Sequence, residues 1–201
     1  MKSFVKILVV IALVLSSTYT QAQTRFGIKG GLNLASITLK VGGVSADTKA
    51  VAGINLGLIS EFTISDNLFL QPGLLFSTKG SKYKISNLSF NTNNIEIPIN
   101  LLYKLGTGST KLFGFAGPYI GYATSGKYGT GGVSSDIKFS GNNKDMNAFD
   151  LGLNIGVGVE VRNLQISTQY GLGLAELNSD NSGSLKNKVI GISVACLFGG
   201  K

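Results

Sequence analysis

The sequence predicts an all-β protein, an eight-stranded antiparallel up-and-down transmembrane β-barrel. Three observations predict this fold. Apolar residues recur at every second position in eight segments of about 11 residues, which is typical of strands with one apolar face. The connections between these segments alternate between long and short. The chain also has only 14% charged residues and as many as 28 glycines in 201 residues, whereas a soluble protein has roughly 25% charged residues.

Residues 1–22 are expected to be a secretory signal peptide that is cleaved off. Two lysines precede a short apolar run that ends at Leu15, and Thr20 and Ala22 occupy the −3 and −1 positions of a small-residue cleavage site. A membrane anchor is the less favoured interpretation, because a spanning helix needs about 20 apolar residues. The remaining domain, 23–201, is expected to be the outer-membrane β-barrel.

The period-two alternation is clearest in residues 149–161, where seven apolar residues alternate with six polar or glycine residues. Seven other segments show the same pattern less regularly. The expected strands are 25–35, 51–63, 67–79, 94–104, 111–123, 149–161, 164–174 and 188–198. The alternation does not settle which face of 111–123 points outward. An even number of strands of this length is typical of an outer-membrane barrel.

The connections favour a membrane barrel over a soluble one. They span 36–50, 64–66, 80–93, 105–110, 124–147, 162–163 and 175–187, and they alternate from long to short along the chain. Outer-membrane barrels have short periplasmic turns and longer outer loops. The sequence therefore predicts export to the bacterial outer membrane, with the four long loops outside and both ends of the barrel domain in the periplasm.

The second face of each strand predicts the content of the bore. It carries glycine, Asn, Gln and Ser together with seven charged residues, which form the candidate interior charge network: Lys29, Glu61, Lys79, Glu96, Lys104, Asp150 and Glu160. The interior of an eight-stranded barrel is just wide enough for side chains. These residues would fit there, and opposite charges could pair. A soluble ligand-binding barrel is less favoured, because its outward face would be polar.

Aromatic residues are expected to form two girdles at the membrane interfaces. The candidates near the short turns are Phe26, Phe62, Tyr103 and Phe198. The candidates near the long loops are Phe76, Phe149 and Tyr170.

The residues that are missing exclude several kinds of chemistry. The chain has 0 histidines, which excludes Ser-His-Asp and Cys-His catalysis and histidine metal ligands. Its 1 cysteine allows no internal disulfide and no thiolate zinc cluster. We therefore expect no catalytic residues, no cofactor and no metal site. An outer-membrane enzyme acting on lipid or peptide is disfavoured, since its usual histidine is absent.

Several segments follow one another in a distinctive order and spacing: Phe26–Ala35, Leu70–Gly80, Ile95–Ile99, Gly117–Tyr119, the run 149–161 and a final strand that ends at Phe198. Together they resemble the PorT-like outer-membrane β-barrel domain of Bacteroidetes-type bacteria. The resemblance covers nearly all of the chain after the signal peptide. It implies the same fold and the same location, and it supplies no catalytic residues. It also implies insertion by the barrel-insertion machinery, which reads a C-terminal aromatic residue such as Phe198.

Two functional interpretations follow from the predicted bore. In the first, the protein is a small integral outer-membrane barrel with a structural or surface-interaction role, and polar side chains fill its bore. In the second, the inward charges line a narrow channel, and the protein is a transport-associated, porin-like protein. Because an eight-stranded bore is normally filled by its own side chains, the first interpretation is favoured.

The long loops predict the partners of the protein. They carry eight lysines and five acidic residues. The lysines are Lys40, Lys49, Lys82, Lys84, Lys127, Lys138, Lys144 and Lys186, and the acidic residues are Asp47, Asp136, Asp145, Glu176 and Asp180. This excess would attract lipopolysaccharide phosphates, or it is ordinary solvated loop charge. The expected partners are outer-membrane lipid, the insertion machinery and a surface or periplasmic protein that the sequence does not identify; no nucleic acid is expected.

Overall fold

The computed structural model describes residues 24–41, 44–82, 88–130, 133–139, 145–178 and 184–200. The predicted signal peptide lies outside the described residues, as do parts of the four long connections. Within these described ranges, no helix is long and apolar enough to cross a membrane.

The described chain is folded into ten strands. They are β1 Thr24–Val41, β2 Val44–Asp47, β3 Lys49–Thr63, β4 Leu68–Lys82, β5 Ser89–Leu105, β6 Thr110–Thr130, β7 Val133–Asp136, β8 Phe149–Val161, β9 Leu164–Gly173 and β10 Ser184–Gly199. Eight of them are long and pair in the order β1-β3-β4-β5-β6-β8-β9-β10, and β10 pairs back with β1. Every pairing is antiparallel and the ring is closed, so the predicted eight-stranded barrel is confirmed.

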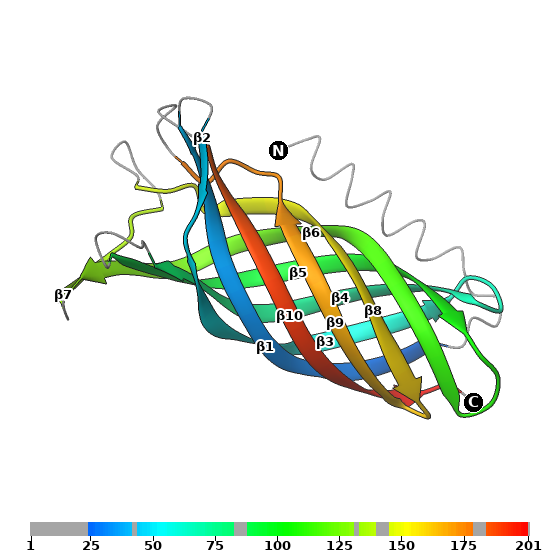
Figure 1. Ribbon diagram of the computed structural model, residues 1–201. Coiled ribbons are helices and arrows are strands. Elements are labelled where there is room, and N and C mark those ends of the chain that lie inside the picture. Colours follow the sequence, from blue (N-terminus) through cyan, green and yellow to red (C-terminus); the bar gives the residue numbers. More distant parts are fainter. Residues whose placement is uncertain are drawn as a thin grey trace, which may run out of the picture.

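The two ends of the barrel differ, as the connections predicted (Figure 1). At one end, here called the turn end, the chain reverses within 64–67, 106–109 and 162–163. The other end, here called the loop end, carries the long connections and the short strands β2 and β7, which pair with the ends of β1 and β6. The strands reach further into the loop end than the alternation predicted. The β5–β6 hairpin, for example, remains paired as far as Ser89 opposite Gly129.

The outer surface of the barrel is apolar. In β8, side chains at every second position from Phe149 to Val157 are exposed, and they include Leu153 and Ile155. The predicted girdle residues Phe26 and Phe198 are exposed and lie directly opposite each other on β1 and β10. At the loop end Tyr122 lies opposite Phe149, and both are exposed. The outward phase predicted for the strands is thereby confirmed.

The interior is less polar than the sequence predicted. Besides polar and charged residues it contains buried apolar side chains: Ile59, Phe69, Leu75, Leu102, Phe113, Phe115, Ala195 and Leu197. The expectation of a bore filled by polar side chains is corrected accordingly. The alternation missed these residues because apolar residues occupy both phases there, as at Leu74 and Leu75 or Leu101 and Leu102.

The structure settles the phase of β6, which the sequence left open. Phe113, Phe115 and Tyr119 point inward and are buried, while Leu112, Ile120 and Tyr122 are exposed. Each inward aromatic residue lies opposite a glycine of β8, in the pairs Phe113 and Gly158, Phe115 and Gly156, and Tyr119 and Gly152. A Cβ atom on Gly156 would lie only 2.4 Å from Cζ of Phe115. The glycines of β8 therefore make room for the aromatic rings of β6.

We predict that Gly156→Ala lowers the free energy of unfolding by about 1–3 kcal/mol, because the new methyl group would meet both Cζ of Phe115 and the carbonyl oxygen of Thr168 at 2.4 Å. Gly114→Ala is the matched control, since a Cβ there would have its nearest neighbour, the Gly156 carbonyl oxygen, at 3.9 Å. It should leave stability unchanged or raise it by about 0.4–1 kcal/mol. Urea unfolding of the refolded barrel, followed by circular dichroism, measures both values. Equal losses for the two variants would contradict this packing.

Candidate functional site inside the barrel

A first cluster of charged side chains fills the bore near the turn end. Nζ of Lys104 on β5 lies 2.7 Å from Oε1 of Glu61 on β3 and 2.6 Å from Oε2 of Glu160 on β8. Arg25 on β1 contacts the same two carboxylates. Its Nη1 donates to Oε1 of Glu160 at 2.9 Å, and its Nε donates to Oε1 of Glu61 at 3.0 Å. This turn-end cluster therefore joins four strands and pairs two cations with two anions.

Two glutamine side chains complete the turn-end cluster. Nε2 of Gln165 donates to Oε2 of Glu61 at 2.9 Å and to Oε2 of Glu160 at 2.8 Å. Nε2 of Gln71 donates to Oε2 of Glu61 at 3.2 Å. The side chains of Glu61 and Lys104 are each only 1% exposed. Buried charges are costly unless they are paired and hydrogen-bonded, so this set of partners is what makes ionised groups tolerable in a narrow bore.

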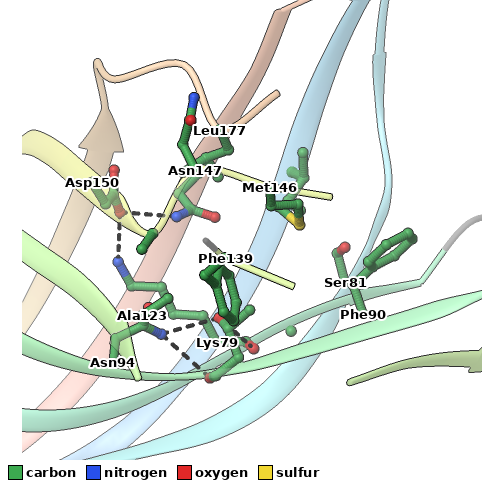
Figure 2. A pocket seen from close by; sticks show the side chains of 15 residues that line it. Lys79, Ser81, Phe90, Asn94, Ala123, Phe139, Met146, Asn147, Asp150 and Leu177 are labelled. Carbon is green, nitrogen blue, oxygen red and sulfur yellow. Dashed lines mark hydrogen bonds and ion pairs between the residues drawn. The ribbon is translucent and has the colours of Figure 1, made fainter. Parts of the chain in front are cut away.

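A second cluster lies nearer the loop end. Nζ of Lys79 on β4 lies 2.7 Å from Oε1 of Glu96 on β5 and 3.0 Å from Oδ2 of Asp150 on β8. The same Asp150 oxygen accepts hydrogen bonds from Oη of Tyr119 at 3.2 Å and from Nδ2 of Asn187 at 2.9 Å. Figure 2 shows the contact between Lys79 and Asp150 as a dashed line. This loop-end cluster again links strands that are far apart in the sequence.

Between the clusters the bore is lined by neutral polar side chains and Lys29. Nδ2 of Asn55 donates to Oδ1 of Asn33 at 2.8 Å. Nζ of Lys29 is 3.4 Å from Oε1 of Gln169 and 6.0 Å from the centre of the Phe115 ring. Within the described chain Lys29 has no carboxylate at ion-pair distance. The groups near its ammonium are the amide oxygen of Gln169 and the ring of Phe115.

An apolar cover closes the loop end. Ile137, Met146 and Leu177 are buried together, and four partly buried side chains pack against them: Phe90, Tyr128, Phe139 and Leu185. The cover is tied to β10 through Glu176, whose carboxylate accepts hydrogen bonds from Ser184 and from the Leu185 N–H. The hydrogen bond from the Ser184 hydroxyl, and to a smaller extent the one from the Leu185 N–H, holds the pKa of Glu176 below its ordinary value.

Six of the seven charged residues predicted from the sequence lie in the two clusters, and Lys29 lies between them. The sequence missed Arg25, which makes four interior cations for four carboxylates. The alternation in the sequence does indicate this position, because Arg25 lies on the same inward face of the strand as Gly27 and Lys29. The sequence also missed Tyr119 as a partner of Asp150, since the phase of its strand was not settled. No group of three or more Cys, Asp or Glu side chains within the described ranges could hold a metal ion.

The cavities in the bore are small. One of about 20 Å³ lies in the middle layer beside Lys29 and Glu96, and one of about 30 Å³ lies under the apolar cover beside Asp150. Each has room for about one or two water molecules. A wider recess of about 410 Å³ opens at the turn end, where Arg25, Lys111 and Arg162 line it. Side chains therefore fill the bore between this recess and the loop end.

A closed ring of antiparallel strands, apolar outside and charged inside, defines a transmembrane β-barrel, because only closure satisfies every strand edge in lipid. The family comparison agrees. The chain belongs to the outer membrane protein beta-barrel domain family, whose model matches residues 21–178. The protein is accordingly an outer-membrane protein, as the sequence predicted.

Solved structures of other outer-membrane proteins are similar to this chain. Neisserial surface protein A is 16% identical, with 86% of this chain and 97% of that chain covered and a TM-score of 0.49. The attachment invasion locus protein Ail of Yersinia pestis is 14% identical, with 88% and 99% covered and a TM-score of 0.47. The outer-membrane enzyme PagL is 12% identical, with 80% and 97% covered and a TM-score of 0.43. No curated protein matches the sequence.

We predict that Lys104→Met lowers the free energy of unfolding by about 3–5 kcal/mol, because Arg25 alone would then face two buried carboxylates. Lys127→Met, on the exposed end of β6, is the control and should change stability by less than about 0.5 kcal/mol. The double variant Lys104→Met/Glu61→Gln restores the balance of charge and should recover part of the loss. Urea unfolding measures all three. A double variant no more stable than Lys104→Met would contradict the role assigned to charge pairing.

Proposed function

We propose that the protein is a closed, non-catalytic outer-membrane barrel with a structural or surface-interaction role. The observation that carries this proposal is the filled bore. Two ion-paired clusters and a row of aromatic rings occupy it, and the voids between them measure about 20 and 30 Å³. Such a bore stabilises the barrel but offers no path to a hydrated solute.

One feature of the sequence and one of the structure support the non-catalytic part of the proposal. The chain has 0 histidines, and each interior carboxylate lies in an ion pair with a buried cation. A carboxylate held in an ion pair is a poor general base, because the neighbouring cation stabilises its ionised form. Within the outer-membrane family, the narrower PorT-like assignment is part of this proposal, as are export by the signal peptide and insertion by the barrel machinery.

The loop end supports a role at the cell surface. The β5–β6 hairpin continues well past the barrel, and β7 adds a fully exposed edge to it over Val133–Asp136 (Figure 1). An exposed strand edge can pair with another chain. Loop lysines such as Lys127 and Lys138 are exposed there and would attract lipopolysaccharide phosphates. A partner on the outer side is therefore proposed for this end of the barrel.

The second candidate function is a narrow channel, and one observation favours it. The recess of about 410 Å³ at the turn end already forms the beginning of a pathway. A continuous path would require the turn-end cluster and the Lys79–Asp150 ion pair to separate together, against their mutual attraction. Because the contacts are numerous and buried, we favour the closed form.

Conductance in planar lipid bilayers tests the proposal. The wild-type protein should give only small or rare currents, since its bore is filled. The double variant Phe115→Ala/Tyr119→Ala removes two rings from the bore and should raise the conductance, which also shows that the assay detects inserted protein. Steady, large and size-selective currents from the wild type would contradict the closed barrel and favour the channel.

A further inference from the structure

The recess at the turn end is a cavity of about 410 Å³ that the closed bore leaves open. All three turns of this end contribute to its lining: Asp66 comes from the β3–β4 turn, Ser109 from the β5–β6 turn and Arg162 from the β8–β9 turn. Two other lining residues, Phe69 and Glu160, are buried inside the barrel. The recess therefore lies within the ring of strand ends and not on the lipid-facing surface.

Two cations beside the recess have no carboxylate partner. Strand register brings Lys111 and Arg162 close together, because Lys111 lies opposite Glu160 and the Arg162 N–H donates to the Ser109 carbonyl oxygen at 2.7 Å. Glu160 is already engaged in the turn-end cluster. In the part of the chain that the structure describes, neither Lys111 nor Arg162 lies within ion-pair distance of a carboxylate. Two positive charges thus border one open space.

The backbone at Arg162 is a second, independent observation. Among the described residues, Arg162 is the non-glycine residue with a positive φ, at 58°. Two-residue hairpin turns favour Asn, Asp or Gly at such a position, because other side chains are strained there. Residues held in strained conformations cluster at functional sites. An arginine is therefore not the residue that the turn itself requires, and its guanidinium lines the recess.

The charges around the recess favour an anion. Arg25 and Glu160 also line it, but they form an ion pair with each other in the turn-end cluster. The remaining charged lining residues are Lys111 and Arg162 against Asp66, which leaves one positive charge in excess. An anionic group would balance this excess.

The kinds of donor decide which anion fits. A guanidinium binds two oxygens of a phosphate side by side, and an ammonium acts as a point charge on a further oxygen. A phosphate has enough oxygens for Arg162 and Lys111 together, and the hydroxyl of Ser109 lines the same recess. A carboxylate has only the two that the guanidinium would occupy. A volume of about 410 Å³ lies within the range of small-molecule sites, so it has room for a substituent on the phosphate.

We propose that the turn-end recess binds the phosphate group of a small polar molecule through Arg162 and Lys111. Such a group occurs in soluble phosphate esters and in phospholipid headgroups. The soluble source is favoured, because the recess lies inside the ring of strand ends. This inference goes beyond the proposed function and does not depend on it, since a closed barrel and a channel both keep the recess.

The experiment titrates the refolded full barrel with glycerol 3-phosphate, observed by phosphorus NMR in dodecyl maltoside micelles, which contain no phosphate. The wild type should bind saturably. Arg162→Asn should weaken binding about tenfold, because charge-assisted hydrogen bonds are lost. Folding should be unaffected, since Asn tolerates the left-handed backbone of this turn. Asp66→Asn should tighten binding about two- to threefold, because it removes a negative charge from the lining.

The controls separate this site from general attraction of anions to a basic protein. Lys138→Gln removes an exposed cation at the loop end and should leave the affinity unchanged. Heat-modifiable gel migration checks that each variant is folded. The proposal is overturned if the wild type shows no saturable binding, if Arg162→Asn and Lys138→Gln behave alike, or if acetate displaces the probe at equal concentration.

Phosphatidylglycerol added to the micelles distinguishes the two sources of phosphate. We expect no displacement of glycerol 3-phosphate, which would assign the recess to soluble phosphates. Displacement from the wild type would overturn that choice and assign the recess to the lipid headgroup.

Discussion

Pairing of β1 with β10 closes the barrel, and the other features of the protein depend on that closure. β1 is paired with β10 on one side and with β3, then β2, on the other, so it leaves no open edge in the membrane. Closure fixes the inside and the outside for every strand at once. Apolar side chains then meet lipid, and charged and bulky side chains must share one narrow bore.

The bore is organised by two kinds of contact. Charged groups from distant strands meet in two clusters, where each carboxylate lies within ion-pair distance of a cation and amide groups donate further hydrogen bonds. Between and beside them, the aromatic side chains of β6 lie against the glycines of β8. The first contact makes buried charge tolerable, and the second fills space that short polar side chains would leave empty.

The loop end differs from the rest of the barrel in its apolar cover. The strands there extend beyond the ring, the cover lies over the bore, and a small cavity of about 30 Å³ lies beneath it. This arrangement accords with the proposed role, in which the barrel anchors the protein in the outer membrane and the loop end makes the contacts.

The sequence by itself determined the fold, the outward phase of seven strands and the inward position of seven charged residues, because a period of two is imposed by strand geometry wherever one face meets lipid. Where both faces of a strand carry apolar residues, the alternation does not show which residues point inward. The inward positions of Phe69, Leu75 and the β6 rings therefore came only from the structure. The sequence also did not indicate which inward side chains contact one another across the bore. Contact between Glu61 and Gln165, 104 positions apart, depends on strand tilt and register around the closed ring. The local pattern therefore determines which face of a strand a side chain lies on, whereas closure of the barrel determines which residue it contacts across the bore.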